Sequence, residues 1–400
     1  MSASLLHHPS DDELRGAGAL KWSIDPPGVI PAWVAEMDLG LAEPIHRAVR
    51  DYADRGIFGY ADPKGRALVG EALSGFALRR WGHHIDPDRV LLVGDVMDGL
   101  TLTLQHVAPA APVIIPTPVY PPFFVVTQAL GLEIRAVPLI RSCESRPDGG
   151  AARAPLVLDL EAIEEEARRG ARTLLLCQPH NPVGRSYSRP ELLALRDIVE
   201  RWGVHVISDE IHAPLTLPGV EFVPYASVAS ADAAVTTLIS ATKAFSMPGL
   251  RCAQLISHRA RDHDTLTGLH PVLNHSMTTI GQQATVAAYT AGEAWLDEVC
   301  RTVAEAHERF RDALDQRLPK IDVEVAEATY LAWLNVRGLR VEDPVAAALT
   351  HGVRVDSQGE GYGPGSRDHI RVNLATSSPR LDRLVDRLCT AWDAGSSTSS

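Results

Sequence analysis

The chain has 400 residues, of which 45% are hydrophobic and 22% are charged, as in ordinary globular proteins. Its formal net charge of −12 disfavours binding along DNA or RNA, because such binding needs a concentrated basic face. No stretch approaches the roughly 20 apolar residues of a membrane span, and the first residues lack the pattern of a secretion signal. We therefore expect a cytoplasmic protein of two domains that binds neither nucleic acid nor a membrane.

The cysteines and lysines narrow the possible chemistry. The five cysteines are scattered singly, without C-x-x-C pairs or metal-ligand spacing, so we expect reduced thiols and neither a metal site nor a disulfide framework. Lysine is rare, so chemistry that needs a neutralisable amine must use one of very few positions. These are Lys21, Lys64, Lys243 and Lys320.

From about residue 43 the sequence alternates between helical periods and short β-rich apolar runs, which is typical of a doubly wound parallel sheet. Helices are predicted at Asp159–Arg169 and Pro190–Trp202, the second with a proline in its first turn. Continuous apolar strands are covered on both faces, so a three-layer α/β/α domain is expected. The predicted strands are Val90–Val93, Val113–Ile115, Ile134–Leu139, Thr173–Cys177, Val204–Ser208, Val235–Ile239 and Cys252–Ile256.

The predicted domain organisation follows these patterns. Residues 1–42 form an N-terminal segment that joins the small domain, and residues 43–285 form the large α/β domain. Residues 286–394 form a smaller α+β domain, because the sequence is strongly helical from Gly281 to about Leu318 and then ends with short strands and one more helix. The tail, residues 395–400, is low in hydrophobicity, so we expect it to be disordered.

Three of the predicted strands end in polar segments, at the place where ligands bind such a sheet. The segments are CQPHNPVG with Asn181, VISDEIHAPL with Asp209 and His212, and LISATKAFSMPGLRCAQ with Ser240, Thr242, Lys243 and Arg251. Each alone is a common pattern. Together they supply what pyridoxal 5′-phosphate (PLP) needs: a lysine to bond, a carboxylate beside the pyridine nitrogen, a polar partner for the ring hydroxyl and donors for the phosphate.

These segments resemble the fold-type I PLP enzymes, the aspartate aminotransferase superfamily, and most of all its cystathionine β-lyase or C–S β-lyase branch of the MalY/PatB type. The resemblance implies the PLP-dependent transferase-like fold, with a mostly parallel seven-stranded sheet, and a homodimer with shared active sites. It spans nearly the whole chain through WVAEMD (33–38), FGYADPKG (58–65), PTPVYPPF (116–123) and RVNLA (371–375).

The resemblance also implies a role for each site residue. Lys243, Asp209 and Tyr120 are the expected catalytic residues: the lysine carries PLP as a Schiff base, the carboxylate keeps the pyridine ring cationic, and the tyrosine stacks on the ring. Asn181 is expected to bond the ring hydroxyl, whereas His212 is either a second partner of that hydroxyl or a core histidine.

The other implied contacts are with the phosphate and the substrate. The phosphate is expected to contact Ser240, Arg251, the backbone N–H groups of Val96 and Met97, and Tyr60 of the neighbouring subunit, and Thr242 is expected to contact the cofactor. Asp95 and Met97 depart from the small-residue turn common in the family, and an acidic group near a phosphate is unfavourable unless it points away or touches a donor. The substrate is expected to contact Arg371, which clamps its α-carboxylate, together with Trp33 and Asn181.

The type of reaction follows from the fate of the carbanion formed when the freed lysine amine removes the Cα proton. Reprotonation gives transamination, and loss of a β-substituent gives elimination. His212 stands where aminotransferases of the superfamily commonly have tyrosine, which favours elimination from L-cystathionine or a related cysteine S-conjugate to a thiol, pyruvate and ammonia. The alternatives are a class I/II aminotransferase and a regulatory protein with a vestigial PLP site.

Overall fold

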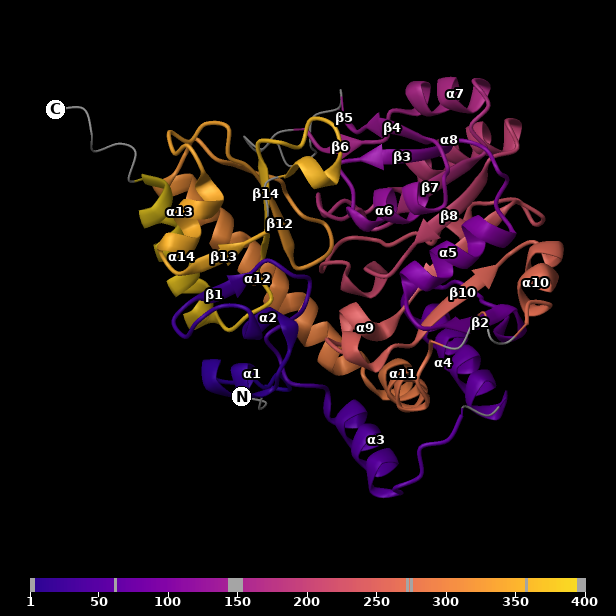
Figure 1. Cartoon of the computed structure of the whole chain (residues 1–400), viewed down its shortest axis with the longest axis horizontal. Coiled ribbons are helices and arrows are strands. Elements are labelled where there is room, and N and C mark those ends of the chain that lie inside the picture. The colour runs from indigo at the N-terminus through magenta and orange to yellow at the C-terminus, as the bar shows by residue number, and fades with distance from the viewer. Residues whose placement is uncertain are drawn as a thin grey trace.

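The seven predicted strands form one sheet in the computed structural model (Figure 1), which describes residues 4–60, 63–142, 154–270, 273, 276–356 and 359–393. Strand β10 runs antiparallel to its neighbours β2 and β9, and all other pairs are parallel. The mostly parallel sheet is thereby confirmed. Its order is β2 (Val90–Val93), β10 (Ala253–Ser257), β9 (Val235–Ile239), β8 (His205–Asp209), β7 (Thr173–Cys177), β3 (Val113–Thr117) and β4 (Ile134–Pro138).

Both faces of this sheet are buried, because successive apolar side chains of each strand point to opposite sides. Ile114 packs with α7 (Leu160–Arg168) and α8 (Arg189–Arg201), whereas Val113 and Ile115 pack with α5 (Val96–His106) and α6 (Pro122–Ala129). The expected three-layer arrangement is therefore confirmed. Helix α8 begins one residue before the predicted start because a reciprocal capping box between Ser188 and Glu191 sets its first turn.

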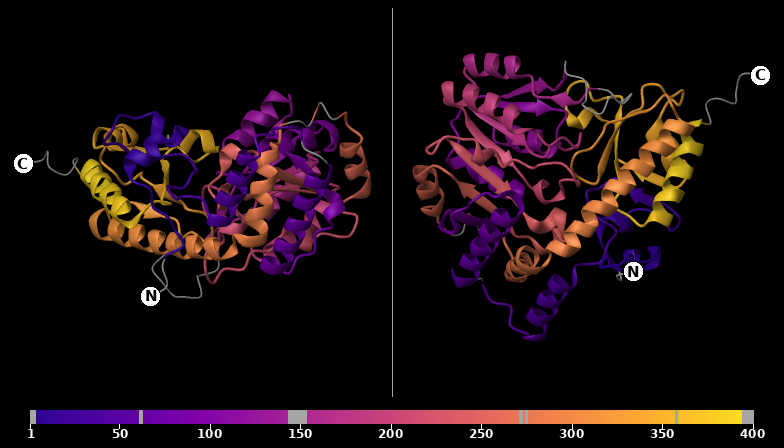
Figure 2. Two further views of the ribbon diagram at one scale, coloured as in Figure 1. Left: turned by 90° about the horizontal axis from the view of Figure 1, so that it is seen from below. Right: turned by 180° about the vertical axis from the view of Figure 1, so that it is seen from behind.

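One long helix joins this sheet to a second core. The first half of α12 (Glu293–Arg317) buries Trp295 and Val299 with helices α3 (Glu43–Asp54), α4 (Pro63–Trp81) and α11 (Thr279–Ala291). Its second half buries Phe310 and Leu314 among the C-terminal elements. Figure 2 shows α12 running obliquely from one part of the molecule to the other.

The C-terminal part is a small α+β unit. Strands β11 (Asp322–Val323), β12 (Leu331–Asn335) and β14 (His369–Asn373) form an antiparallel sheet, covered by α13 (Pro344–Thr350) and α14 (Ser378–Asp393). The N-terminal β1 (Ile30–Ala32) pairs in parallel with β13 (Val353–Val355) and so adds the start of the chain to this unit. The domain boundaries stay predictions, and the predicted tail, residues 395–400, lies outside the described residues.

The remaining elements are short and include α1 (Asp11–Gly16), α2 (Leu20–Ser23), β5 (Ile140–Arg141), β6 (Leu156–Val157), α9 (Ala241–Ala244), α10 (Ala260–Thr267) and the 3₁₀ turn η6 (Gly359–Tyr362). None of the helices in the described ranges is long and apolar enough to cross a membrane.

Candidate active site

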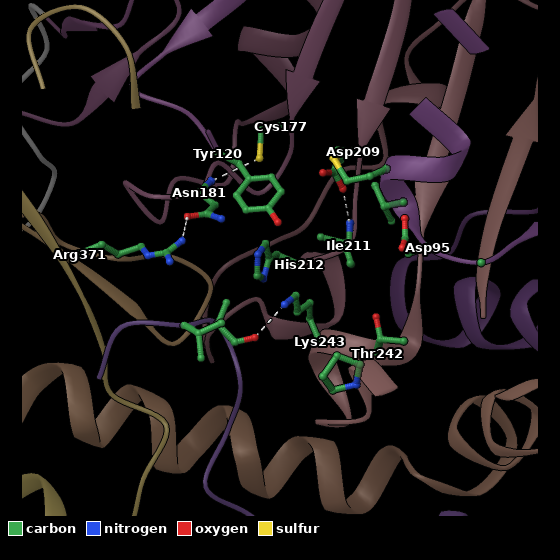
Figure 3. A pocket seen from close by; sticks show the side chains of 16 residues that line it. Asp95, Tyr120, Cys177, Asn181, Asp209, Ile211, His212, Thr242, Lys243 and Arg371 are labelled. Carbon is green, nitrogen blue, oxygen red and sulfur yellow. Dashed lines mark hydrogen bonds between the residues drawn. The ribbon is translucent and has the colours of Figure 1, made fainter. Parts of the chain in front are cut away.

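A cavity of about 250 Å³ lies at the carboxyl ends of the central strands, where the sheet meets the N-terminal segment and β14 (Figure 3). Strands β7 and β8 end at Cys177 and Asp209, which are direct partners across the parallel pair and both line the cavity. The loop after β3 and the short helix after β9 add further side chains. The cavity thus lies where ligands bind doubly wound sheets. Of the predicted site residues, its lining contains Val96, Met97, Tyr120, Asn181, Asp209, His212, Thr242, Lys243 and Arg371.

Lys243 and Asp209 are two ionisable groups of this cavity whose charged forms are disfavoured by burial. Lys243 follows β9 on helix α9, and its Nζ donates to the carbonyl oxygen of Ala35 at 2.8 Å. Burial, with a smaller contribution from the nearby Arg371 charge, lowers the pKa of Lys243 to about 8. Asp209 is 5% exposed, and burial raises its pKa to about 7 although its Oδ1 accepts a hydrogen bond from the N–H of Ile211 at 3.1 Å. Such opposed displacements in one cavity mark a functional site.

The side chains of Asn181, Tyr120 and His212 face the same space in Figure 3. Asn181 follows β7, is 4% exposed and accepts from Nη1 of Arg371 at 3.3 Å. Burial raises the pKa of the Tyr120 phenol. Burial also lowers the pKa of His212 to about 3, so its imidazole is neutral, and its buried Nδ1 has no hydrogen-bond partner among the described residues. An unpaired buried ring nitrogen is costly, which favours a role in binding a ligand over that of a satisfied core histidine.

Arg371 reaches the cavity from β14 and is held from several sides. Its Nη2 lies 2.6 Å from Asp356 Oδ2 and donates to the carbonyl oxygen of Trp33 at 3.0 Å. The Tyr362 hydroxyl donates to the same carboxylate oxygen of Asp356, and the guanidinium carbon lies 5.5 Å from the centroid of the Tyr362 ring. The buried Nε of Arg371 has no partner in the described part of the chain. This fixed fork therefore keeps donor capacity for a carboxylate.

Polar groups also gather where α5 begins. Asp95 is the N-cap of α5, and its Oδ1 accepts from the N–H of Asp98 at 2.9 Å, so the N–H groups of Val96 and Met97 belong to the open first turn. Helix N-termini with free N–H groups attract anions. Thr242 lines the same cavity beside Lys243. This end of the cavity can hold an anionic group.

Four predicted site residues do not line the cavity. Ser240 caps α9, and its hydroxyl donates to the carbonyl oxygen of Cys252 at 2.8 Å. Arg251 pairs with Asp95, which lines the cavity, and with Asp98, which does not. Tyr60 is 98% exposed. The ring nitrogen of Trp33 donates to the carbonyl oxygen of Lys21 at 3.5 Å. The backbone oxygen of Trp33, and not its ring, contacts Arg371.

Some groups of the site were not expected from the sequence. Cys177 lines the cavity, and burial raises the pKa of its thiol, which is therefore neutral. It stands directly before the Q-P-H-N-P segment, so its position at a strand end was the available signal. Ala35 contributes a backbone oxygen, for which no side chain gives a signal. Asp356 could be recognised only by knowing which residues lie beside β14.

A family model described as aminotransferase class I and II matches residues 34–388. The chain belongs to the class I and II aminotransferase family. Within this family, a Mycobacterium leprae protein assigned as a cystathionine β-lyase is 34% identical, covering 97% of this chain and 98% of its own length. The cystathionine β-lyase of Corynebacterium glutamicum is 31% identical over 96% of this chain and 99% of its own.

The solved structures agree with the sequence relatives. A chain from Corynebacterium diphtheriae, assigned as a PLP-dependent β-cystathionase, superposes with a TM-score of 0.89 at 31% identity, covering 97% of this chain and 99% of that one. These matches confirm the resemblance to the cystathionine β-lyase branch of the aminotransferase class I and II family. They also confirm the fold class that the sequence predicted.

Proposed function

We propose that the protein is a PLP-dependent C–S β-lyase that cleaves L-cystathionine or a related cysteine S-conjugate into a thiol, pyruvate and ammonia. The observation that carries the proposal is a buried amine and a buried carboxylate, Lys243 and Asp209, in one cavity of this fold. The names of the relatives, cystathionine β-lyase and β-cystathionase, support cleavage of a carbon–sulfur bond.

The residues present fit PLP. The raised pKa of Asp209 and the lowered pKa of Lys243 both arise from burial without a sufficient partner. A cationic pyridine nitrogen would satisfy the carboxylate, and a covalent bond would remove the charge of the amine. The buried Nδ1 of His212 and Nε of Arg371, which have no partner among the residues that the structure describes, are two further polar atoms that could contact bound molecules.

Each part of the cofactor then has holders on this chain. Lys243 would bond to it, Asp209 would pair with the ring nitrogen, and Tyr120 would stack on the ring. Asn181 and His212 would serve the ring hydroxyl. Thr242 and the N–H groups of Val96 and Met97 would hold the phosphate, with Ser240 and Arg251 contributing from outside the lining.

When bound, PLP supplies an electron sink that stabilises negative charge at the substrate Cα. The Lys243 amine, with a pKa of about 8, is partly neutral near neutral pH and takes the Cα proton as a general base. Arg371 holds the α-carboxylate with its guanidinium fork, and Trp33 fixes that fork through its backbone oxygen. His212 stays neutral because of its lowered pKa and adds no charge beside the reacting carbon.

The deciding assay measures pyruvate and thiol release from L-cystathionine and S-alkyl cysteines, with amino transfer to 2-oxoglutarate measured in parallel. We expect elimination without an added keto acid, and its loss in Lys243→Ala and Asp209→Ala but not in the surface variant Lys320→Ala. Amino transfer without pyruvate release would replace the proposal by an aminotransferase, the second candidate, which the family name supports. PLP binding without either reaction would point to a regulatory protein.

We also propose a homodimer with shared active sites in the cytoplasm. The connection after α3 carries three large hydrophobic side chains that the single chain leaves exposed: Ile57 at 77%, Phe58 at 69% and Tyr60 at 98%. Exposed apolar groups gathered in this way are typical of interaction surfaces. In the proposed dimer Tyr60 reaches the phosphate of the other subunit. Tyr60→Phe is expected to weaken PLP binding without changing the dimer, as measured by sedimentation and cofactor titration.

A further inference from the structure

The arginine expected to hold the cofactor phosphate is bound between two carboxylates. Nη2 of Arg251 lies 3.1 Å from Asp95 Oδ2 and 3.0 Å from Asp98 Oδ2. Both acids belong to the start of α5, and Asp95 also lines the cavity. The hydroxyl of Ser276 donates to Asp98 Oδ2 at 2.5 Å and accepts from the N–H of Gly94 at 3.2 Å, so the second carboxylate is fixed in place.

The charges of this cluster oppose an incoming phosphate. Two carboxylates face one guanidinium, so the three side chains carry one excess negative charge at the end of the cavity where anions are expected. The helix N-terminus attracts anions there, but the carboxylate of Asp95, the N-cap of α5, already provides a negative charge at that end. The ion pairs of Asp95 and Asp98 both involve Nη2 of Arg251. Their expected effect on a phosphate is electrostatic, because each carboxylate repels a like charge nearby.

We propose, resting on the proposed PLP function, that Asp95 and Asp98 act as counter-charges that weaken the hold on the cofactor phosphate and so set a low affinity for PLP. An enzyme built in this way exchanges its cofactor with free PLP more readily than one whose phosphate arginine is unopposed. The side chains of Arg251, Asp95 and Asp98 are 44%, 43% and 37% exposed, so solvent reaches the cluster and the repulsion is moderate.

The test compares two ligands on the apoenzyme, PLP and pyridoxal, which lacks the phosphate. The variants Asp95→Asn and Asp98→Asn remove one charge each, and asparagine is as good an N-cap as aspartate, so α5 keeps its start. We expect the dissociation constant for PLP to fall on the order of tenfold in Asp95→Asn, as removal of one unit charge a few ångströms from a phosphate implies. Asp98→Asn is expected to act in the same direction.

Pyridoxal affinity is expected to stay unchanged in both variants, which also reports that the rest of the cavity is folded. The matched control is Asp343→Asn, because Asp343 caps α13 in the small unit and lies outside the cavity lining. This control is expected to leave the dissociation constants for both PLP and pyridoxal unchanged.

Dissociation constants are measured by the absorbance of the bound cofactor and by quenching of tryptophan fluorescence. If wild type binds PLP and neither Asn variant binds it more tightly, the counter-charge inference is wrong while the proposed function stands. If both variants bind pyridoxal and PLP more tightly by the same factor, the effect does not act on the phosphate, and the inference is equally wrong. A wild-type enzyme that binds neither compound overturns the proposed function and this inference with it.

Discussion

Replacing Lys243 by methionine is expected to stabilise the apoenzyme at neutral pH. Burial lowers the pKa of Lys243 from 10.5 to about 8, so the buried amine costs about 3 kcal/mol of folding free energy below a pH of about 8, where it is charged in both states. Methionine fills a similar volume without that charge. It loses the hydrogen bond to the Ala35 oxygen, worth about 1 kcal/mol, which leaves a net gain of about 2 kcal/mol.

The sign of the pH dependence follows from the same numbers. Below a pH of about 8 the lysine is charged in both states and the full cost applies to the wild type. Between about 8 and 10.5 the folded state has released the proton while the unfolded chain still holds it, so wild-type stability rises with pH relative to the variant. The advantage of Lys243→Met therefore shrinks across this window, because methionine does not titrate.

Urea unfolding of PLP-free protein at a series of pH values, at one fixed protein concentration, measures this difference. Lys320→Met is the matched control, because Lys320 lies on the surface, and it is expected to leave the curves unchanged. An apo Lys243→Met that is less stable than wild type at neutral pH would refute the reasoning. A gain that stays constant up to a pH of about 10 would also refute it, since apolar packing and not charge burial would then be the cause.

Three further outcomes are expected. Burial raises the pKa of Glu210 to about 8, so the free energy of unfolding of the wild type falls as pH rises from 4.5 to about 8. Glu210→Gln does not titrate there, so its free energy of unfolding, measured with urea, is expected to rise relative to that of the wild type across this range. Lys21→Ala removes the nearer cationic partner of the buried Asp38, at 2.8 Å, and leaves Arg380 at 3.8 Å, so it is expected to cost roughly 3 kcal/mol, measured as a lower Tm. Asp356→Asn removes the negative charge 2.6 Å from Nη2 of Arg371, so the arginine attracts the substrate carboxylate more strongly, and KM for pyruvate release is expected to fall roughly fivefold at similar kcat.

The strands of the large sheet were predictable because the sequence pattern of each strand is local. Each strand is a short apolar run bounded by turn residues, and the burial of Ile114 on one face and Ile115 on the other follows from the strand period alone. The pairing of Ile30 with Val353 was not predictable in the same way. It joins residues more than 300 positions apart, and three-residue strands carry too little periodicity to distinguish them from loops.

The site likewise contains residues that local sequence patterns predict and contacts that they do not. Lys243 and Asp209 were found because their side chains follow strand ends, and the sheet brings strand ends together. The roles of backbone atoms left no trace in the sequence: the oxygens of Ala35 and Trp33 bind the amine and the guanidinium regardless of which side chains those positions carry. The capture of Arg251 by carboxylates was predictable only in part: contact of Asp95 with a donor was one of the expected arrangements, but no local pattern identified Arg251 as that donor or Asp98 as its second partner.

The segment Trp33–Asp38 links the two halves of the site. Its backbone oxygens hold Lys243 from the large sheet and Arg371 from the small unit, and Asn373 donates to the oxygens on either side of Ala35, at 2.7 and 2.6 Å. The distance between the amine that removes a proton and the arginine that holds the substrate is therefore set by one stretch of backbone. At the far end of that stretch stands Asp38 with its buried ion pair. Loss of that pair should consequently disturb both partners together, raising KM and lowering kcat, whereas a change at either side chain alone affects its own step.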